Sequence, residues 1–172
     1  MEWWEKGKYP LQIGKSNFLR IVDFYLFNCP VYNKVQISRV SVMGKTFEER
    51  HITGKRLTTL LKDMRNMVET FKLVDGKEDI ENVLEAETKK LKYKSDAFQI
   101  VCFIENSDLG QTKTIFYSIR NALAHGAFSV KSIKKEKYYY FENRNRGKVK
   151  AQLKIKESTL LEWIKLVEKY TI

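Results

Sequence analysis

Apolar residues recur at helical spacing in three long segments, and this periodicity constrains the fold more than any other feature of the sequence. The segments are residues 53–71, residues 112–124 and the stretch that begins at Glu157. In each of them one apolar stripe is formed at positions i, i+3 and i+4, which is typical of a helix that buries one face. The sequence therefore predicts a mostly helical protein, with Trp163 on the flank of the last helix.

Four other segments give weaker signals. Residues 16–29 are also apolar at helical spacing and predict a helix that Pro30 stops. Residues 77–90 are acidic at the start and basic at the end, which complements a helix dipole. Residues 95–105 form a short apolar run that fits a buried helix or a strand, and we favour a helix. Residues 31–49 are irregular and fit either a loop or short strands.

The segment before the last helix has a different pattern. Residues 127–133, 137–143 and 148–156 alternate or are aromatic and β-branched, and residues 145–147 read as a turn. They predict a small antiparallel β-meander. We therefore expect a mostly α helical bundle with a small β-meander before the C-terminal helix, built as a single domain over residues 1–172.

The charge of the chain favours a polyanionic partner. Lys and Arg number 32 against 21 Asp and Glu, which gives a formal net charge of +11 at pH 7. Such a surface attracts a phosphate backbone and releases its counterions on binding. The alternative is a lysine-rich protein with no nucleic-acid partner.

The cysteines and the N-terminus bound the remaining possibilities. Cys29 and Cys102 lie in apolar runs and are expected to be buried free thiols. Two His and two Cys without ligand spacing predict no metal site and no cofactor. The first residues lack the pattern of a signal peptide, and no apolar run approaches the ~18 residues of a membrane span, so we expect a cytoplasmic protein with no membrane partner.

The most distinctive string in the chain is Ser-Ile-Arg-Asn-Ala-Leu-Ala-His-Gly-Ala-Phe at residues 118–128. In a helix, Asn121 and His125 lie four residues apart on one face, and the long side chain of Arg120 can converge on them. Gly126 fits the position that ends the helix. His125 then meets the negative end of the helix dipole, where an acid or base residue is useful.

This string resembles the signature of the HEPN clan, in particular the subset written Arg-Asn-Ala-Leu-Ala-His-Gly. The match covers about a dozen residues and extends loosely to the C-terminal third, whereas the first half carries no matching motif. The resemblance implies a HEPN-like bundle and a metal-independent endoribonuclease of the toxin or phage-defence kind. His125 would act on the ribose 2′-hydroxyl, Arg120 would neutralise charge on the phosphate, and Asn121 would orient either group. The products would be a 2′,3′-cyclic phosphate and a 5′-hydroxyl.

The resemblance also implies partners. HEPN domains typically dimerise so that two motifs form one composite cleft, so a homodimer is expected, together with a restraining antitoxin such as a minimal nucleotidyltransferase. Two alternatives stay open. One is a non-catalytic HEPN module that binds RNA or a protein partner, and the other is a basic interaction protein unrelated to the clan.

Cations and aromatic rings alternate along the meander, which is typical of single-stranded RNA-binding surfaces. The rings are those of residues 138–141. The candidate RNA-binding cations are Lys131, Lys134, Lys135, Arg144, Arg146 and Lys148. The alternative is a half-buried aromatic strand beside a solvated charged turn. His51 has no catalytic neighbours in sequence and is expected to be an exposed or capping residue.

Overall fold

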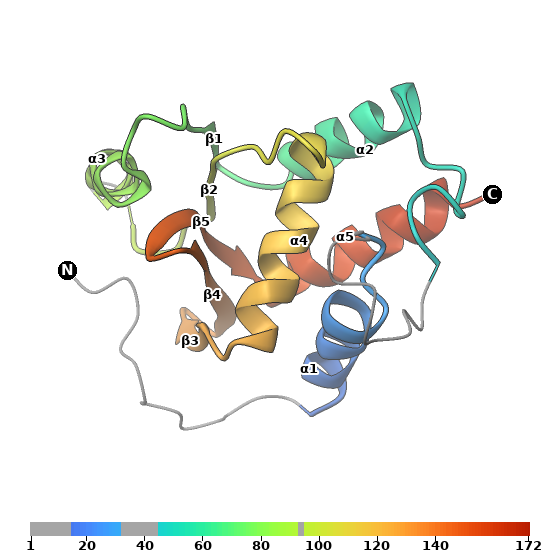
Figure 1. The fold of residues 1–172 in the computed structure, drawn as a ribbon. Coiled ribbons are helices and arrows are strands. Elements are labelled where there is room, and N and C mark those ends of the chain that lie inside the picture. Colours follow the sequence, from blue (N-terminus) through green and yellow to red (C-terminus); the bar gives the residue numbers. More distant parts are fainter. Residues whose placement is uncertain (1–14, 32–44, 93–94) are drawn as a thin grey trace.

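A computed structural model describes residues 15–31, 45–92 and 95–172 of the chain. The described residues form both helices and strands (Figure 1). The elements are α1 (Lys15–Val22), a π-helical turn η1 (Asp23–Phe27), α2 (Lys55–Arg65), β1 (Thr70–Leu73), α3 (Ile80–Lys92), β2 (Ile100–Phe103), α4 (Gly110–Ala124), β3 (Phe128–Ile133), β4 (Glu136–Asn145), β5 (Lys148–Lys156) and α5 (Glu157–Tyr170).

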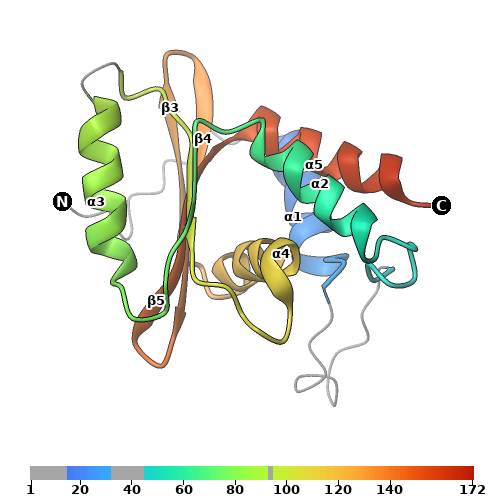
Figure 2. The same ribbon diagram turned by 90° about the horizontal axis from the view of Figure 1, so that it is seen from above.

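The centre of the fold is a five-stranded mixed sheet with the order β1-β2-β5-β4-β3. β1 and β2 are parallel, and the other neighbouring strands are antiparallel. Figure 2 shows the sheet edge-on, with α3 on one face and α1, α2, α4 and α5 on the other. The prediction of a mostly helical bundle is therefore wrong, because the protein has an α/β architecture in which a sheet separates two helical layers.

The error came from the two short strands. The apolar stripe of residues 53–71 continues past the point where α2 ends, at Arg65, so Phe71 lies in β1 rather than in the helix. β2 is buried on both faces and shows no alternation, and such a run cannot be told from a buried helix by periodicity. Together β1 and β2 turn a three-stranded meander into a five-stranded sheet.

The other elements follow their predictions more closely. β3, β4 and β5 form the predicted meander, and α4 and α5 occupy the predicted helical segments. α3 lies where the charge pattern placed a helix, and residues 16–29 are helical up to Phe27. Most of residues 31–49 lies outside the described part of the chain.

Each face of the sheet has its own apolar core. The larger core lies between the sheet and the four helices, and its strand residues are Val101, Phe103, Tyr139, Phe141, Ala151, Leu153 and Ile155. The smaller core lies under α3, where Ile80 and Leu84 meet Ile100, Cys102 and Val149. Burial on both sides explains why the central strands are apolar at consecutive positions.

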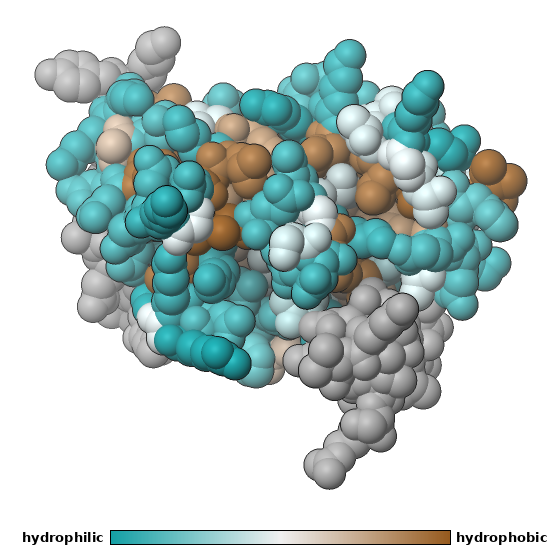
Figure 3. All heavy atoms as spheres, turned by 45° about the horizontal axis from the view of Figure 1, so that its top comes forward, coloured by the Kyte–Doolittle hydropathy of each residue, from teal (hydrophilic) through white to brown (hydrophobic). Residues whose placement is uncertain are grey.

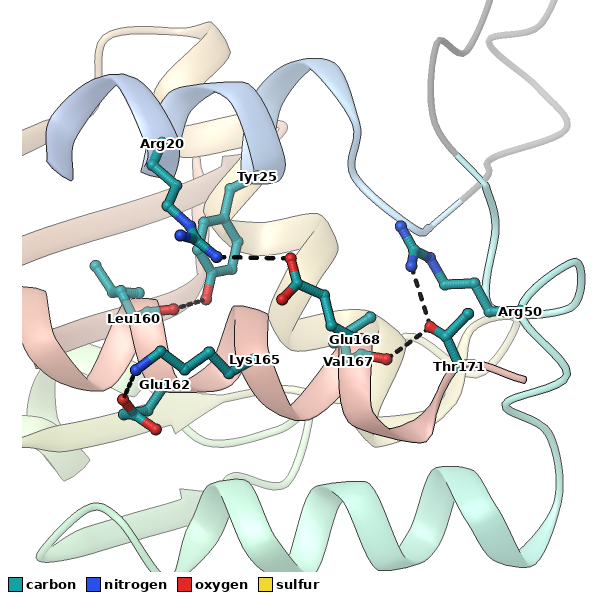
Figure 4. A network of polar contacts seen from close by, with 9 residues as sticks. All are labelled: Arg20, Tyr25, Arg50, Leu160, Glu162, Lys165, Val167, Glu168 and Thr171. Atoms are coloured by element: carbon teal, nitrogen blue, oxygen red, sulfur yellow. Dashed lines mark hydrogen bonds and ion pairs between the residues drawn. The ribbon is translucent and has the colours of Figure 1, made fainter. Parts of the chain in front are cut away.

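Helix α5 is held on several sides, so Trp163 is fully buried and not on a flank as predicted. Polar contacts fasten this helix to its neighbours (Figure 4). The Tyr25 hydroxyl donates to the Leu160 carbonyl at 2.7 Å, and the Arg50 Nη1 donates to the Thr171 Oγ1 at 3.1 Å. These bonds tie η1 and the segment before α2 to the two ends of α5.

A buried carboxylate links α1, β4 and α5. Glu157 opens α5 and accepts hydrogen bonds from the Tyr139 hydroxyl at 2.6 Å and from the Asn17 Nδ2 at 3.0 Å. The pKa of Tyr139 lies far above its usual range, mainly because the hydroxyl is buried and also because it bonds to Glu157. The tyrosine is therefore a permanent donor to this carboxylate.

The Tyr139→Phe substitution should destabilise the protein by about 1–3 kcal/mol, because a buried carboxylate oxygen loses its donor. Tyr138→Phe is the matched control, since the Tyr138 hydroxyl is buried and has no hydrogen-bond partner among the described residues, so its loss should cost less than about 0.5 kcal/mol. Urea unfolding of the two variants measures the difference. Equal losses would show that the Tyr139–Glu157 bond contributes nothing of its own.

Candidate functional site

The candidate motif lies at the C-terminal end of α4, where the helix runs down onto the sheet and continues into β3 (Figure 1). His125 caps the helix, and its backbone N–H donates to the Asn121 carbonyl at 2.9 Å. Gly126 follows with a φ of +66°, and the Ala127 N–H then donates to the Ala122 carbonyl at 2.8 Å. The prediction that Gly126 ends the helix is confirmed, because this left-handed conformation favours glycine.

The apolar face of α4 fixes the direction of the motif. Phe116 packs against the rings of Tyr25, at 5.8 Å between centroids, and of Phe47, at 5.2 Å. Ile115, Phe116, Ile119 and Leu123 all belong to the larger core. With this face buried, Arg120 and Asn121 are half-buried and His125 is exposed.

Arg120 and Asn121 belong to a chain of side-chain hydrogen bonds that reaches the sheet. The Arg120 Nη1 donates to the Asn121 Oδ1, the Asn121 Nδ2 donates to the Asn143 Oδ1, and the Asn143 Nδ2 donates to the Ser118 Oγ. Each of these distances is 3.4 Å. The structure therefore joins two predicted site residues to each other and adds two that the sequence analysis missed.

The two missed residues have different signals in the sequence. Asn143 follows Tyr139 and Phe141 at alternate positions of β4, so its side chain lies on the helix side of the sheet. An amide at such a position is a signal that the strand alternation could have given. Ser118 carries no comparable signal, because small polar residues occur in helices at exposed and buried positions alike.

The imidazole of His125 takes no part in this series of side-chain hydrogen bonds, and only the His125 backbone N–H bonds to Asn121. Within residues 15–31, 45–92 and 95–172 its imidazole has no hydrogen-bond or ion-pair partner. Arg120 likewise has no carboxylate partner in the described part of the chain. The site thus offers an exposed imidazole and a guanidinium whose charge no acid of the described residues neutralises.

Cys29 lies close to Arg120 but is poorly suited to act as a nucleophile. Burial raises the pKa of its thiol to about 11, although the Val31 backbone and the nearby Arg120 charge work in the opposite direction. Its Sγ contacts the Phe116 carbonyl at 3.8 Å. The prediction that Cys29 and Cys102 are buried free thiols is confirmed.

The predicted RNA-binding cations do not form one surface. Lys134 and Lys135 lie at the turn between β3 and β4, whereas Arg144, Arg146 and Lys148 lie at the turn between β4 and β5. β4 separates the two turns with ten residues, or about 30 Å at 3.3 Å per residue. α4 leads into β3 at Phe128, which pairs with Phe141 toward the C-terminal end of β4. Of the two turns, only the β4–β5 turn lies at that end of the sheet.

Several of these cations already have partners. Arg144 pairs with Glu142 and, at 3.3 Å, with Glu81, while the Lys148 Nζ donates to the Gly76 carbonyl at 2.6 Å. The Lys134 Nζ donates to the Ser95 Oγ at 3.1 Å. Lys131 lies on the α3 side of the sheet, with its Nζ 5.2 Å from the centre of the Tyr140 ring.

Arg146 and Lys135 differ from the other cations. Both are exposed, and neither has a hydrogen-bond or ion-pair partner among the residues that the structure describes. Each occupies a tight turn with positive φ, 50° for Arg146 and 67° for Lys135. His51, at φ 58°, is exposed, as expected.

The described residues contain no group of three or more His, Cys, Asp or Glu side chains that could hold a metal ion. Among the same residues, no helix has the length and apolar character that crossing a membrane requires. The face drawn in Figure 3 is largely hydrophilic, with apolar patches interrupted by polar side chains.

Comparisons with known proteins do not assign the chain to a family. No family model matches it, and no curated protein or solved structure matches it either.

Neither cysteine should react with iodoacetamide at pH 8 in the folded protein. With a raised pKa of about 11 for Cys29 and about 12 for Cys102, the thiolate fraction at this pH is about one in a thousand or less. Both should react once urea unfolds the chain, as mass spectrometry can measure. Rapid alkylation of Cys29 in the folded state would contradict this account and make the thiol a candidate for site chemistry.

Proposed function

We propose that the protein is a metal-independent endoribonuclease of the toxin or phage-defence kind, acting at the C-terminal end of α4. The observation that carries the proposal is that one helix end presents an exposed His125 together with an Arg120 that has no acidic partner in the described chain. The resemblance of residues 118–128 to the HEPN signature supports it. The proposal rests on these residues and not on a helical bundle.

The residues supply the functions that phosphodiester transfer needs. His125 would take the proton from the ribose 2′-hydroxyl as its oxygen attacks phosphorus, and the bond to the 5′-oxygen would break. The Arg120 guanidinium would donate to the non-bridging oxygens, where negative charge accumulates. Proton transfer to the leaving 5′-oxygen completes a 2′,3′-cyclic phosphate and a 5′-hydroxyl. DNA lacks the attacking hydroxyl and would not be cut.

The resemblance leads us to propose a homodimer as well. A second copy would bring its own His125 to the leaving oxygen, so that one imidazole takes a proton while the other gives one. Sedimentation equilibrium at micromolar concentration would test this, since a monomer at all concentrations would leave each site with a single imidazole. An antitoxin, such as a minimal nucleotidyltransferase, is proposed on the same ground.

A second candidate function is an RNA-binding or protein-binding module without activity. The observation that favours it is the absence of any hydrogen bond from the described residues to the His125 imidazole, so none of these residues fixes the ring before substrate binds. A formal charge of +11 supports RNA binding in either case. The two functions differ in whether bound RNA is cut.

The His125→Asn and Arg120→Ala variants should each cleave an RNA oligonucleotide in EDTA at least about a hundredfold more slowly than the wild type. The first loses a proton acceptor and the second a charged donor to the phosphate. His51→Asn is the matched control, because it replaces the other histidine at an exposed turn where asparagine tolerates the positive φ. RNA that stays intact with the wild type, although it binds, would support the non-catalytic module.

The Arg146→Asn substitution should weaken RNA binding and lower the salt dependence of the binding constant by about one charge. Arg146 lies three residues beyond Asn143, or about 10 Å along the strand, and can contact a phosphate next to the site. Lys135→Asn is the matched control, with the same exposure and positive φ but about 26 Å away from Asn143. Fluorescence anisotropy at several salt concentrations measures both. An equal effect of the two variants would mean that RNA follows net charge and not this end of the sheet.

A further inference from the structure

Asn143 is a buried amide in an otherwise apolar setting. Its side chain lies on the helix side of β4, where the neighbouring inward positions, Tyr139 and Phe141, belong to the larger core. Only 8% of Asn143 is exposed, and Ser118 opposite it on α4 is 1% exposed. Burying an amide costs free energy unless its groups find partners. Here both ends of the amide find them on α4.

The chain of bonds has a fixed direction. A guanidinium has donors and no acceptor, so the group that meets Arg120 must be an oxygen. The Asn121 Oδ1 takes that place, which leaves the Asn121 Nδ2 to meet the Asn143 Oδ1. The Asn143 Nδ2 then meets the Ser118 Oγ, which can accept. Turning the Asn121 amide by 180° would set donor against donor and acceptor against acceptor.

We propose that Asn143 is a positioning residue for the RNA-cleaving site, acting through Asn121 on Arg120. This inference rests on the proposed function. The Asn143 Oδ1 accepts from the Asn121 Nδ2 and so fixes the orientation of the Asn121 amide. The Asn121 Oδ1 then faces Arg120 and holds the guanidinium in position for the phosphate. The pairing of β4 with β5 shifts its register between Asn143 and Arg144, where Lys150 of β5 is the extra residue. Such irregularities recur next to active sites.

The test uses Asn143→Leu, which keeps the approximate volume and removes both polar groups. We expect kcat for RNA cleavage to fall about tenfold or more, with KM within about twofold of the wild type, because Asn143 does not touch the RNA. Gln152→Leu is the matched control. Gln152 is another buried amide of the sheet, on the α3 side, and its loss should leave kcat within about twofold.

A double-mutant cycle separates positioning from a merely structural role. In the Asn121→Ala background, Asn143→Leu should change kcat by less than about twofold, since the residue through which it acts is gone. The same loss of kcat in both backgrounds, or a change confined to KM, would overturn the assignment.

NMR of the side chains tests the inference even if the wild type cuts no RNA. In the wild type the Asn121 Nδ2 protons should give two resolved signals, and in Asn143→Leu these should move toward those of a freely solvated amide. Hydrogen exchange at the Arg120 Nη protons, one of which donates to the Asn121 Oδ1, should accelerate in the same variant. Unchanged Asn121 and Arg120 signals would overturn the positioning role, whereas intact RNA with changed signals would overturn only the nuclease.

Discussion

The sheet depends on β5, which is hydrogen-bonded to a strand on each of its two sides. β5 pairs with β2 on one side and with β4 on the other, so it joins the parallel β1–β2 pair to the C-terminal meander. Without it the β1–β2 pair would not be joined to the meander, and the face under α3, which β2 and β5 form together, would be divided. The pairing also fixes the register of β4, and that register places Asn143 beneath α4.

The candidate site lies where the last turn of α4 meets the end of β4. α4 buries one side in the larger core, and its last turn meets the end of β4 before the chain enters β3. Arg120, Asn121 and Asn143 gather where α4 meets the end of β4. Arg120 and Asn121 are therefore supported by a rigid helix and a central strand, while His125 is left at the surface. Rigid elements hold reacting groups more accurately than loops do.

Sequence patterns predicted the parts of the fold that depend on local periodicity. The stripe of Ile115, Phe116, Ile119 and Leu123 identified α4, and alternation identified the meander. The architecture was missed because β1 and β2 are four residues each and β2 is apolar throughout, so their pairing with distant strands left no periodic signal. Trp163 was misplaced for a related reason, since α1, α2 and the sheet pack around α5 and bury a position that one helix alone would leave at its edge.

The site shows the same division. Arg120, Asn121 and His125 could be recognised because they are close in sequence, although helix geometry puts only Asn121 and His125 on one face. Asn143 is 22 residues from Asn121, and only the register of β4 brings the two amides within 3.4 Å. The basic residues of the meander looked like one surface in sequence, but the ten-residue length of β4 separates them.

The central claim is that the site at the end of α4 catalyses attack of a ribose 2′-hydroxyl on the neighbouring phosphodiester without a metal. Mapping the ends of RNA fragments produced by the purified protein in EDTA tests this claim most directly. The account predicts 2′,3′-cyclic phosphates facing 5′-hydroxyls at every cut. Fragments with 3′-hydroxyl and 5′-phosphate ends would contradict it, because water and not the 2′-hydroxyl would then be the nucleophile.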